Sequence, residues 1–240
     1  MRASNLIYWL GHLSSVRGVH ASISQMLRMY RYHRTPFPTL LKNVLDVLER
    51  YEAKFTFAVV ASIATEDLLL HLRERGHEIA SHSLYHVKHN GLTFETQLDY
   101  IKRSLDLLRY LGAAVQGFRA PYNSYDAKTF KCLDQLGFLY DAGVRRGADY
   151  EGLSKPFHML VNGVRSRFLS FPVCHLSDEL LDRLCQKTVL QSFLRHIDSI
   201  PDEGLSVLQL HPVRIGQPAY LKFLEGIVGY VENQGYSMPT

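Results

Sequence analysis

Short apolar runs alternate with helical patterns along most of this 240-residue chain, and this alternation restricts the possible folds more than any other feature. Strands are expected at residues 6–10, 55–61, 78–81, 117–119, 138–141, 168–173, 205–211 and 236–238. Helices are expected at residues 40–48, 65–75, 94–111, 126–136, 179–197 and 220–234, with a long loop at 143–167. Strand–helix alternation with short connections predicts βαβ units and a mainly parallel sheet.

The number of such units favours one domain, residues 1–240, with residues 1–39 as an atypical N-terminal region. A full eight-unit barrel typically takes about 250 residues. We therefore expect an α/β fold, a distorted (β/α) barrel that is closed or slightly incomplete, with an open doubly wound sheet as the alternative. No apolar run approaches the roughly 18 residues of a membrane-spanning helix. Residues 6–10 are too short for a secretion signal, which favours a cytoplasmic location over a secreted one.

The acidic residues are unevenly distributed, because residues 1–45 contain six basic side chains and no carboxylate, and the first acid is Asp46. These six charges are spread out, so we expect a solvated basic region and no nucleic-acid partner. The three cysteines, Cys132, Cys174 and Cys185, are widely spaced and include no C-x-x-C pair. This pattern argues against both a disulfide framework and a thiolate zinc site.

Polar, reactive side chains follow four of the predicted strands, at the point where each strand ends. His82 and His86 follow the strand at 78–81, and Arg119 ends the strand at 117–119. Asp141 and His211 end two later strands. Because the carboxyl ends of parallel strands meet at one edge of a barrel, we expect these side chains to lie close together.

The spacing of His82 and His86 allows both imidazoles to face one metal ion, for which Zn²⁺ is the best candidate. A chain with 12 histidines contains such a pair by chance often enough that the spacing alone decides little. Its position directly after a short strand strengthens the prediction. His77 and His89 are expected on the surface.

Several of these segments together resemble the polysaccharide deacetylases, carbohydrate esterase family 4, which carry the nodulation-type deacetylase domain. Residues 76–86 (GHEIASHSLYH) resemble the family's second motif, H-[ST]-x-x-H, and residues 118–122 (FRAPY) resemble its third, R-x-P-Y. Residues 55–61 are similar to its A-T-F-F strand, and residues 208–211 (LQLH) to its last motif. The resemblance extends over about residues 40–145 and, less closely, 205–240.

The resemblance implies hydrolysis of an N-acetyl group on an amino sugar by a barrel that holds one divalent metal. His82 and His86 would be the metal ligands, and Pro121 and Tyr122 would bind the substrate, an N-acetylated saccharide. An N-acyl or N-formyl group on a lipid-linked amino sugar is a related possibility.

The remaining roles implied by the resemblance concern proton transfer and charge. His211 would be the general acid that protonates the leaving amine, and Asp141 would tune it. Arg119 would position a catalytic carboxylate, and the Tyr122 backbone N–H would help to hold the oxyanion. These roles are physically reasonable, since a metal-bound water reaches a pKa of about 7 and an imidazole can supply a proton near its own pKa.

The first motif of the family, T-F-D-D, is missing from this sequence. One of its aspartates is the base and the other is the third metal ligand, but Trp9 and Leu10 stand in their place. Because no carboxylate precedes Asp46, a shift in register does not restore the motif. His12 or His20 could supply a third ligand, since catalytic zinc sites normally use three.

Three explanations of this departure stay open. The chain is a diverged, catalytically impaired member that binds carbohydrate, or an active protein with an altered N-terminus, or an enzyme with a different base and ligand set. The sequence thus favours a hydrolase of carbon–nitrogen bonds other than peptide bonds, with a non-catalytic carbohydrate-binding protein as the alternative.

Overall fold

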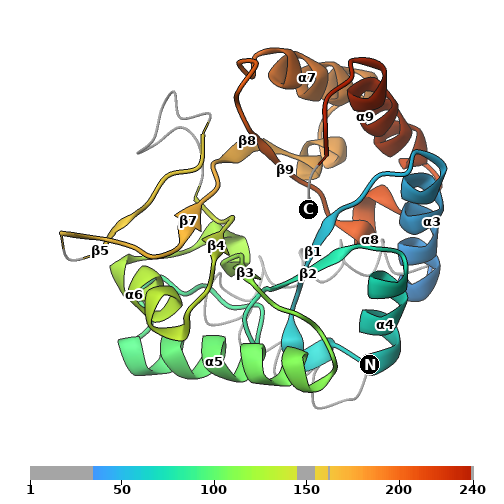
Figure 1. Ribbon diagram of the computed structural model, residues 1–240. Coiled ribbons are helices and arrows are strands. Elements are labelled where there is room, and N and C mark those ends of the chain that lie inside the picture. The colour runs from blue at the N-terminus through green and yellow to red at the C-terminus, as the bar shows by residue number, and fades with distance from the viewer. Residues whose placement is uncertain (1–34, 145–154, 162, 239–240) are drawn as a thin grey trace.

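The computed structural model describes residues 35–144, 155–161 and 163–238 (Figure 1). The strand expected at residues 6–10, with Trp9 and Leu10, lies outside the described residues. The same holds for His12 and His20, the two candidate third ligands. The prediction of a single domain over residues 1–240 stays a prediction.

The described strands form a mainly parallel α/β fold, as predicted. Five strands make one parallel sheet in the order β1 (Thr56–Val59), β2 (Glu78–Ser81), β3 (Gly117–Phe118), β4 (Tyr140–Asp141) and β7 (Leu169–Ser170). A second parallel pair consists of β8 (Val173–Ser177) and β9 (Val207–Gln209). Figure 1 shows these strands in the middle of the molecule with the helices outside them, which is the arrangement of a distorted (β/α) barrel.

Most helices begin and end where their sequence signals predict. In the described part of the chain the α-helices are α3 (Phe37–Arg50), α4 (Glu66–Glu74), α5 (Phe94–Tyr110), α6 (Ala127–Leu136), α7 (Gln186–Asp198), α8 (Pro212–Ile215) and α9 (Leu221–Asn233). The same residues include three short 3₁₀ helices, η1 (Ala61–Ile63), η2 (Pro121–Asn123) and η3 (Asp178–Asp182). The side chains of Thr65 and Thr93 accept backbone N–H groups at the starts of α4 and α5, and Asp126 forms a capping box at α6. Gly137 ends α6 in the left-handed conformation that favours glycine.

Two clusters of buried side chains form the core, and α3 contributes to both. One cluster combines α3 with α4, α5, α6 and the first strands through residues such as Leu45, Leu72, Leu105 and Phe118. The other combines an adjacent face of α3 with α7 and α9 through residues such as Val44, Phe193 and Phe223. The apolar positions of α3, which recur at helical spacing, therefore serve both clusters.

Four sequence predictions differ from the structure. The strand expected at 168–173 is two strands, β7 and β8, separated by Pro172, which has no N–H to donate to a ladder. The helix expected at 179–197 is η3 followed by α7, with a break that no glycine or proline marks. The loop expected at 143–167 contains an antiparallel hairpin, β5 (Leu160–Val161) with β6 (Val164–Arg165). Residues 236–238 form no strand.

None of the described helices combines the length and the apolar character that crossing a bilayer requires.

Gly117 is the position in the sheet where a side chain is least tolerable. A Cβ there would overlap the ring of Tyr140 on the neighbouring strand, whose hydroxyl donates to Glu78 at 2.8 Å. We expect Gly117→Ala to lower the free energy of unfolding by about 1–3 kcal/mol, as overpacking in a core does. Denaturant unfolding measures this change.

The overlap explanation has an internal control. The cost of Gly117→Ala should disappear largely in a Tyr140→Ala background and persist in a Tyr140→Phe background, which keeps the ring. An equal cost in both backgrounds would show that another contact is responsible.

Candidate active site

The structure brings His82, His86, Arg119 and His211 together at the carboxyl ends of strands from the five-stranded sheet and from the β8–β9 pair. His82 follows β2, Arg119 follows β3 and His211 follows β9. The backbone N–H of His82 donates to Val59 at the end of β1, and that of Arg119 donates to Ser81 at the end of β2. His82 and Arg119 are therefore positioned by the parallel hydrogen-bond ladder, which continues one residue past each strand.

The His82 and His86 imidazoles face each other across a tight bend, with ring centroids 5.0 Å apart. Nδ1 of His82 donates to the Arg119 carbonyl at 2.7 Å, which fixes the tautomer because a carbonyl can only accept. Burial, and then the nearby charges of His86, Arg119 and His211, hold the pKa of His82 well below 6.5. His82 is thus a neutral imidazole whose Nδ1 carries the proton and whose Nε2 carries a lone pair. This tautomer can bind a metal through Nε2.

Tyr122 packs its ring against His86, with centroids 4.4 Å apart, from the 3₁₀ helix η2. Tyr122 (φ 60°) and Asn123 (φ 48°) both adopt the left-handed backbone region that favours glycine. Such strain persists only where surrounding contacts impose it, and it is concentrated at functional sites. Here the contacts are the buried Pro121 and a 2.8 Å hydrogen bond from Asn123 to Gln209 on β9.

Asp141 lies at the end of β4 and is 2% exposed. Burial raises its pKa to about 7, against the opposing effects of the Gly143 backbone N–H and the Arg119 charge. Arg119 itself donates through Nε to the Ala142 carbonyl at 2.8 Å. Asp141 is therefore an acidic neighbour of Arg119 at the base of the site.

The carboxylate that contacts His211 is Asp178, and not Asp141. Asp178 Oδ1 lies 2.6 Å from Nδ1 of His211, and Oδ2 accepts the His211 backbone N–H at 2.8 Å. Arg214 also donates to Asp178, at 3.3 Å, and to Asp182, at 3.1 Å. Sequence reasoning missed Asp178 because it ended the strand at 173. The observed strand β8 runs to Ser177, so Asp178 follows a strand end as the other site residues do.

Two further histidines, His77 and His89, are buried, and the prediction that they lie on the surface is wrong. His77 accepts the Phe55 backbone N–H at 3.2 Å, and His89 Nε2 contacts Ser83 Oγ at 2.9 Å. Burial lowers the pKa of each to about 4. His89 thereby supports the bend that carries His82 and His86, whereas His77 packs at the other end of β2, against Phe57.

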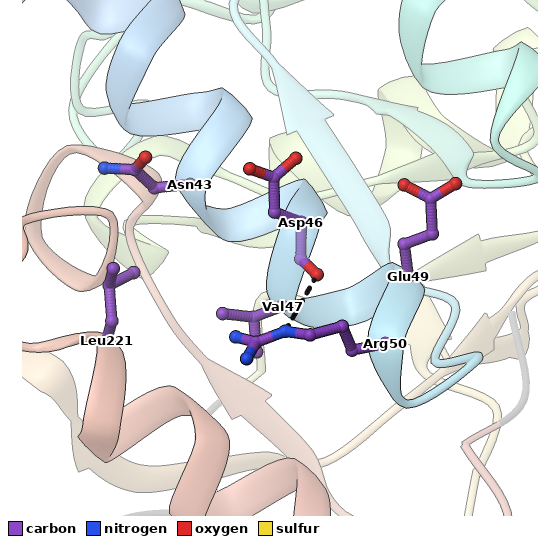
Figure 2. Close-up of a pocket in the computed structure, with 6 residues that line it drawn as sticks. All are labelled: Asn43, Asp46, Val47, Glu49, Arg50 and Leu221. Atoms are coloured by element: carbon purple, nitrogen blue, oxygen red, sulfur yellow. Dashed lines mark hydrogen bonds between the residues drawn. The ribbon is translucent and has the colours of Figure 1, made fainter.

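A surface hollow elsewhere on the molecule shares no residue with this site. Figure 2 shows it between α3 and α9, where Arg50 donates to the Asp46 carbonyl at 3.3 Å. Its lining residues are Asn43, Asp46, Val47, Glu49, Arg50 and Leu221. It lies on helix surfaces rather than at the strand ends, where the reactive groups gather.

A barrel-like α/β fold with polar groups gathered at the carboxyl ends of its strands has the architecture of an enzyme domain. Residues 30–140 match the family model described as polysaccharide deacetylase. The resemblance found in the sequence is thereby confirmed. No curated protein matches the chain.

Solved structures support the same fold. A protein from Mycobacterium smegmatis assigned as a polysaccharide deacetylase is 22% identical, with a TM-score of 0.67, covering 84% of this chain and 80% of that one. A family 4 carbohydrate esterase from Streptomyces lividans, in complex with acetate, is 13% identical, with a TM-score of 0.60 and coverage of 84% and 85%. A mutant of a family 4 pseudoenzyme, with restored enzymatic activity, is 16% identical, with a TM-score of 0.58 and coverage of 82% and 59%.

The expected metal can be tested only in part against the residues present. His82 and His86 fit as two ligands, because they are adjacent imidazoles and the first has the tautomer that ligation needs. Within the described part of the chain, no third histidine, cysteine or carboxylate groups with them closely enough to complete a ligand set. The binding of Zn²⁺ by His82 and His86 stays a prediction.

The raised pKa of Asp141 gives the stability of the protein a specific pH dependence. Between about pH 4 and pH 7 the folded state holds a proton on Asp141 that the unfolded state releases, so this group lowers stability as the pH rises. The slope from this group alone reaches about 1.4 kcal/mol per pH unit. We expect Asp141→Asn to remove this pH dependence, so that the free energy of unfolding of the variant rises relative to that of wild type as the pH rises.

The comparison must be made as a difference between variant and wild type. The pKa values of His77 and His89 are lowered in the folded state, so these two groups reduce the free energy of unfolding as the pH falls. This offsets the Asp141 effect in the wild-type curve. Urea unfolding of both proteins across this pH range gives the difference directly. A difference that does not change with pH would contradict the assignment.

Proposed function

We propose that this chain is a polysaccharide deacetylase-like hydrolase that removes an N-acetyl group from an amino sugar. The observation that carries the proposal is the contact between the buried Asp178 carboxylate and the partly exposed His211, whose charge acts on His82. The family match and the fold of the carbohydrate esterase from Streptomyces lividans support the chemistry.

His211 has the features of a general acid for the leaving amine. Asp178 is fully buried and accepts from Nδ1, so the proton on that nitrogen is held and Nε2 is the nitrogen that faces substrate. The His211 side chain is 36% exposed, so a saccharide can reach it. The Asp178 contact fixes the orientation of the ring, so that its other nitrogen can transfer a proton to the leaving amine.

The other residues position the amide. The left-handed backbone at Tyr122 turns the η2 loop toward His86, where its N–H would stabilise negative charge on the amide oxygen. Arg119 adds positive charge beside His82. A divalent metal held by His82 and His86 would act as a Lewis acid on the same oxygen.

A second function, carbohydrate binding without hydrolysis, is favoured by one specific observation. The family's aspartate pair is replaced by Trp9 and Leu10, and no carboxylate precedes Asp46. Asp141 is a poor replacement for the base, because it is buried beside Arg119. The existence of a family 4 pseudoenzyme with the same fold supports this alternative.

The deacetylase proposal is tested by acetate release from N-acetylglucosamine oligomers, with Zn²⁺ or Co²⁺ added. We expect His211→Ala to lower kcat at least about 100-fold, the lower limit of what general acid catalysis contributes. Asp178→Ala in the His211→Ala background should add little, because both residues serve one proton transfer. Additive losses would show that Asp178 acts elsewhere.

The matched control for this experiment is Lys42→Ala, on the surface of α3 away from the site, which should leave kcat unchanged. N-formyl and lipid-linked substrates in the same assay identify the acyl group and carrier. No release from any substrate, together with saccharide binding that survives His82→Ala, would favour the binding function.

The missing aspartates allow a test of the second function by gain of activity. If the site is impaired only by their absence, the double variant Trp9→Asp, Leu10→Asp should bind Zn²⁺ more tightly than wild type, because it adds an oxygen ligand. It should also release acetate faster. Wild-type activity that this variant abolishes would show instead that the chain uses another base and ligand set.

A further inference from the structure

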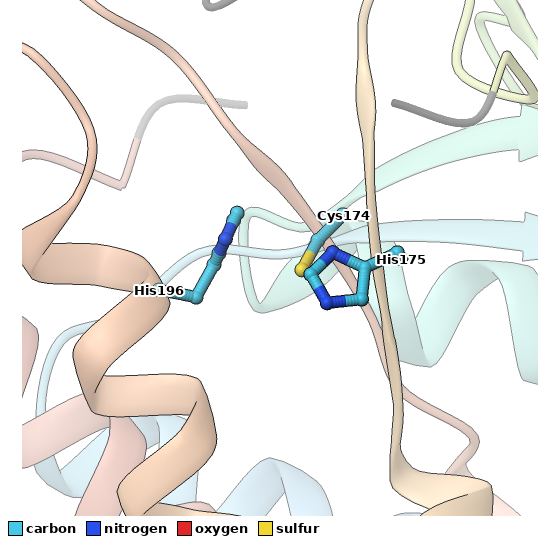
Figure 3. Close-up of side chains that lie close together, drawn as sticks. All are labelled: Cys174, His175 and His196. Carbon is cyan, nitrogen blue, oxygen red and sulfur yellow. The ribbon is translucent and has the colours of Figure 1, made fainter. Parts of the chain in front are cut away.

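A cluster of three metal-ligating side chains lies apart from the candidate active site. Cys174 and His175 on β8 and His196 on α7 each offer a ligand atom, and these atoms lie within 4.8 Å of one another. Figure 3 shows Cys174 and His175 extending from the strand toward His196 on the facing helix. The two imidazoles are nearly perpendicular, with centroids 6.0 Å apart.

An irregularity in β8 explains how two consecutive residues of a strand can serve one site. Neighbouring side chains of a regular strand point to opposite faces. Here Val173 pairs with Val207 and Ser177 pairs with Gln209, so three residues of β8 stand opposite one residue of β9. Such a bulge redirects side chains, and bulges are common beside functional sites.

The surroundings of the cluster suit metal ligation. The Leu176 backbone N–H donates to the Cys174 sulfur at 3.3 Å, and a hydrogen bond of this kind favours the thiolate. Ser206 Oγ lies 2.7 Å from Nε2 of His196 and holds the ring orientation, as outer partners of metal-bound histidines do. Cys174 and His196 are buried, whereas His175 is exposed and gives access from solvent.

We propose that Cys174, His175 and His196 bind a divalent transition metal of the Zn²⁺ class. One thiolate and two imidazoles form a ligand set typical of zinc, with the fourth position open to solvent beside His175. The absence of a C-x-x-C pair in the sequence predicts no thiolate zinc site, because that signal requires paired cysteines. The ligands here come from two elements, and only one is a cysteine.

The position of the cluster points to a structural role. Cys174 is near the start of β8, and Ser206 directly precedes β9, whereas Asp178 and His211 follow the ends of the same two strands. The metal would therefore connect β8 to α7 at the edge opposite the reactive groups. Binding only to the folded state would raise the melting temperature.

Cobalt titration of the full chain separates this site from the histidine pair. Only a thiolate ligand gives the near-ultraviolet charge-transfer band of a Co²⁺–sulfur bond, so the band reports the cluster and not His82 and His86. We expect one equivalent of Co²⁺ to produce the band, and Zn²⁺ to bleach it. Cys174→Ser should abolish it, and the matched control Cys185→Ser, an exposed cysteine outside the cluster, should keep it.

Variants that do not disturb the core guard against loss of folding. The exposed His175→Ala should weaken Co²⁺ affinity at least about tenfold, and Ser206→Ala should weaken it by about the same factor. His82→Ala should leave the band unchanged, because His82 is not part of the cluster. No band in wild type, or a band that survives Cys174→Ser or is unaffected by His175→Ala, would overturn the proposal.

Discussion

The Asp178 carboxylate has no exposure to solvent, and the arrangement of the C-terminal half of the site depends on how its charge is satisfied. It accepts from the backbone and the ring of His211 and from Arg214, which also contacts Asp182. A buried charge without partners is strongly destabilising, so the folded state retains these contacts together. As a result η3, the end of β9 and α8 are held by one group, and the His211 ring has one orientation.

The Asp178 network meets the N-terminal half of the site at His82. The bend after β2 is supported by the buried His89, through Ser83, and by the Arg119 carbonyl, which accepts from His82. Asn123 joins η2 to Gln209 on β9. The site is therefore formed between strands that are far apart in sequence, and its geometry is a property of the assembled sheet.

Much of the fold could be predicted because its signals are local. Periodicity located α3, α5 and α9, the caps Thr65 and Asp126 marked helix starts, and the strand ends placed His82, Arg119 and His211 at one edge. What sequence reasoning missed depends on contacts distant in the chain. Asp178 was hidden by a strand boundary, and the break between η3 and α7 has no glycine or proline to mark it. The burial of His77 and His89 depends on packing partners that a single sequence does not reveal.

The bulge in β8 affects the side chains at both ends of that strand. The two extra residues opposite Leu208 set the side toward which Cys174 and His175 turn and, downstream, the point at which Asp178 leaves the strand. A single-residue deletion between the two pairing points of β8 would change its register with β9, and so displace either the cluster or Asp178 from its partners. The length of this five-residue strand is therefore constrained from both ends, because one end carries the metal-ligating side chains and the other positions the carboxylate that contacts His211.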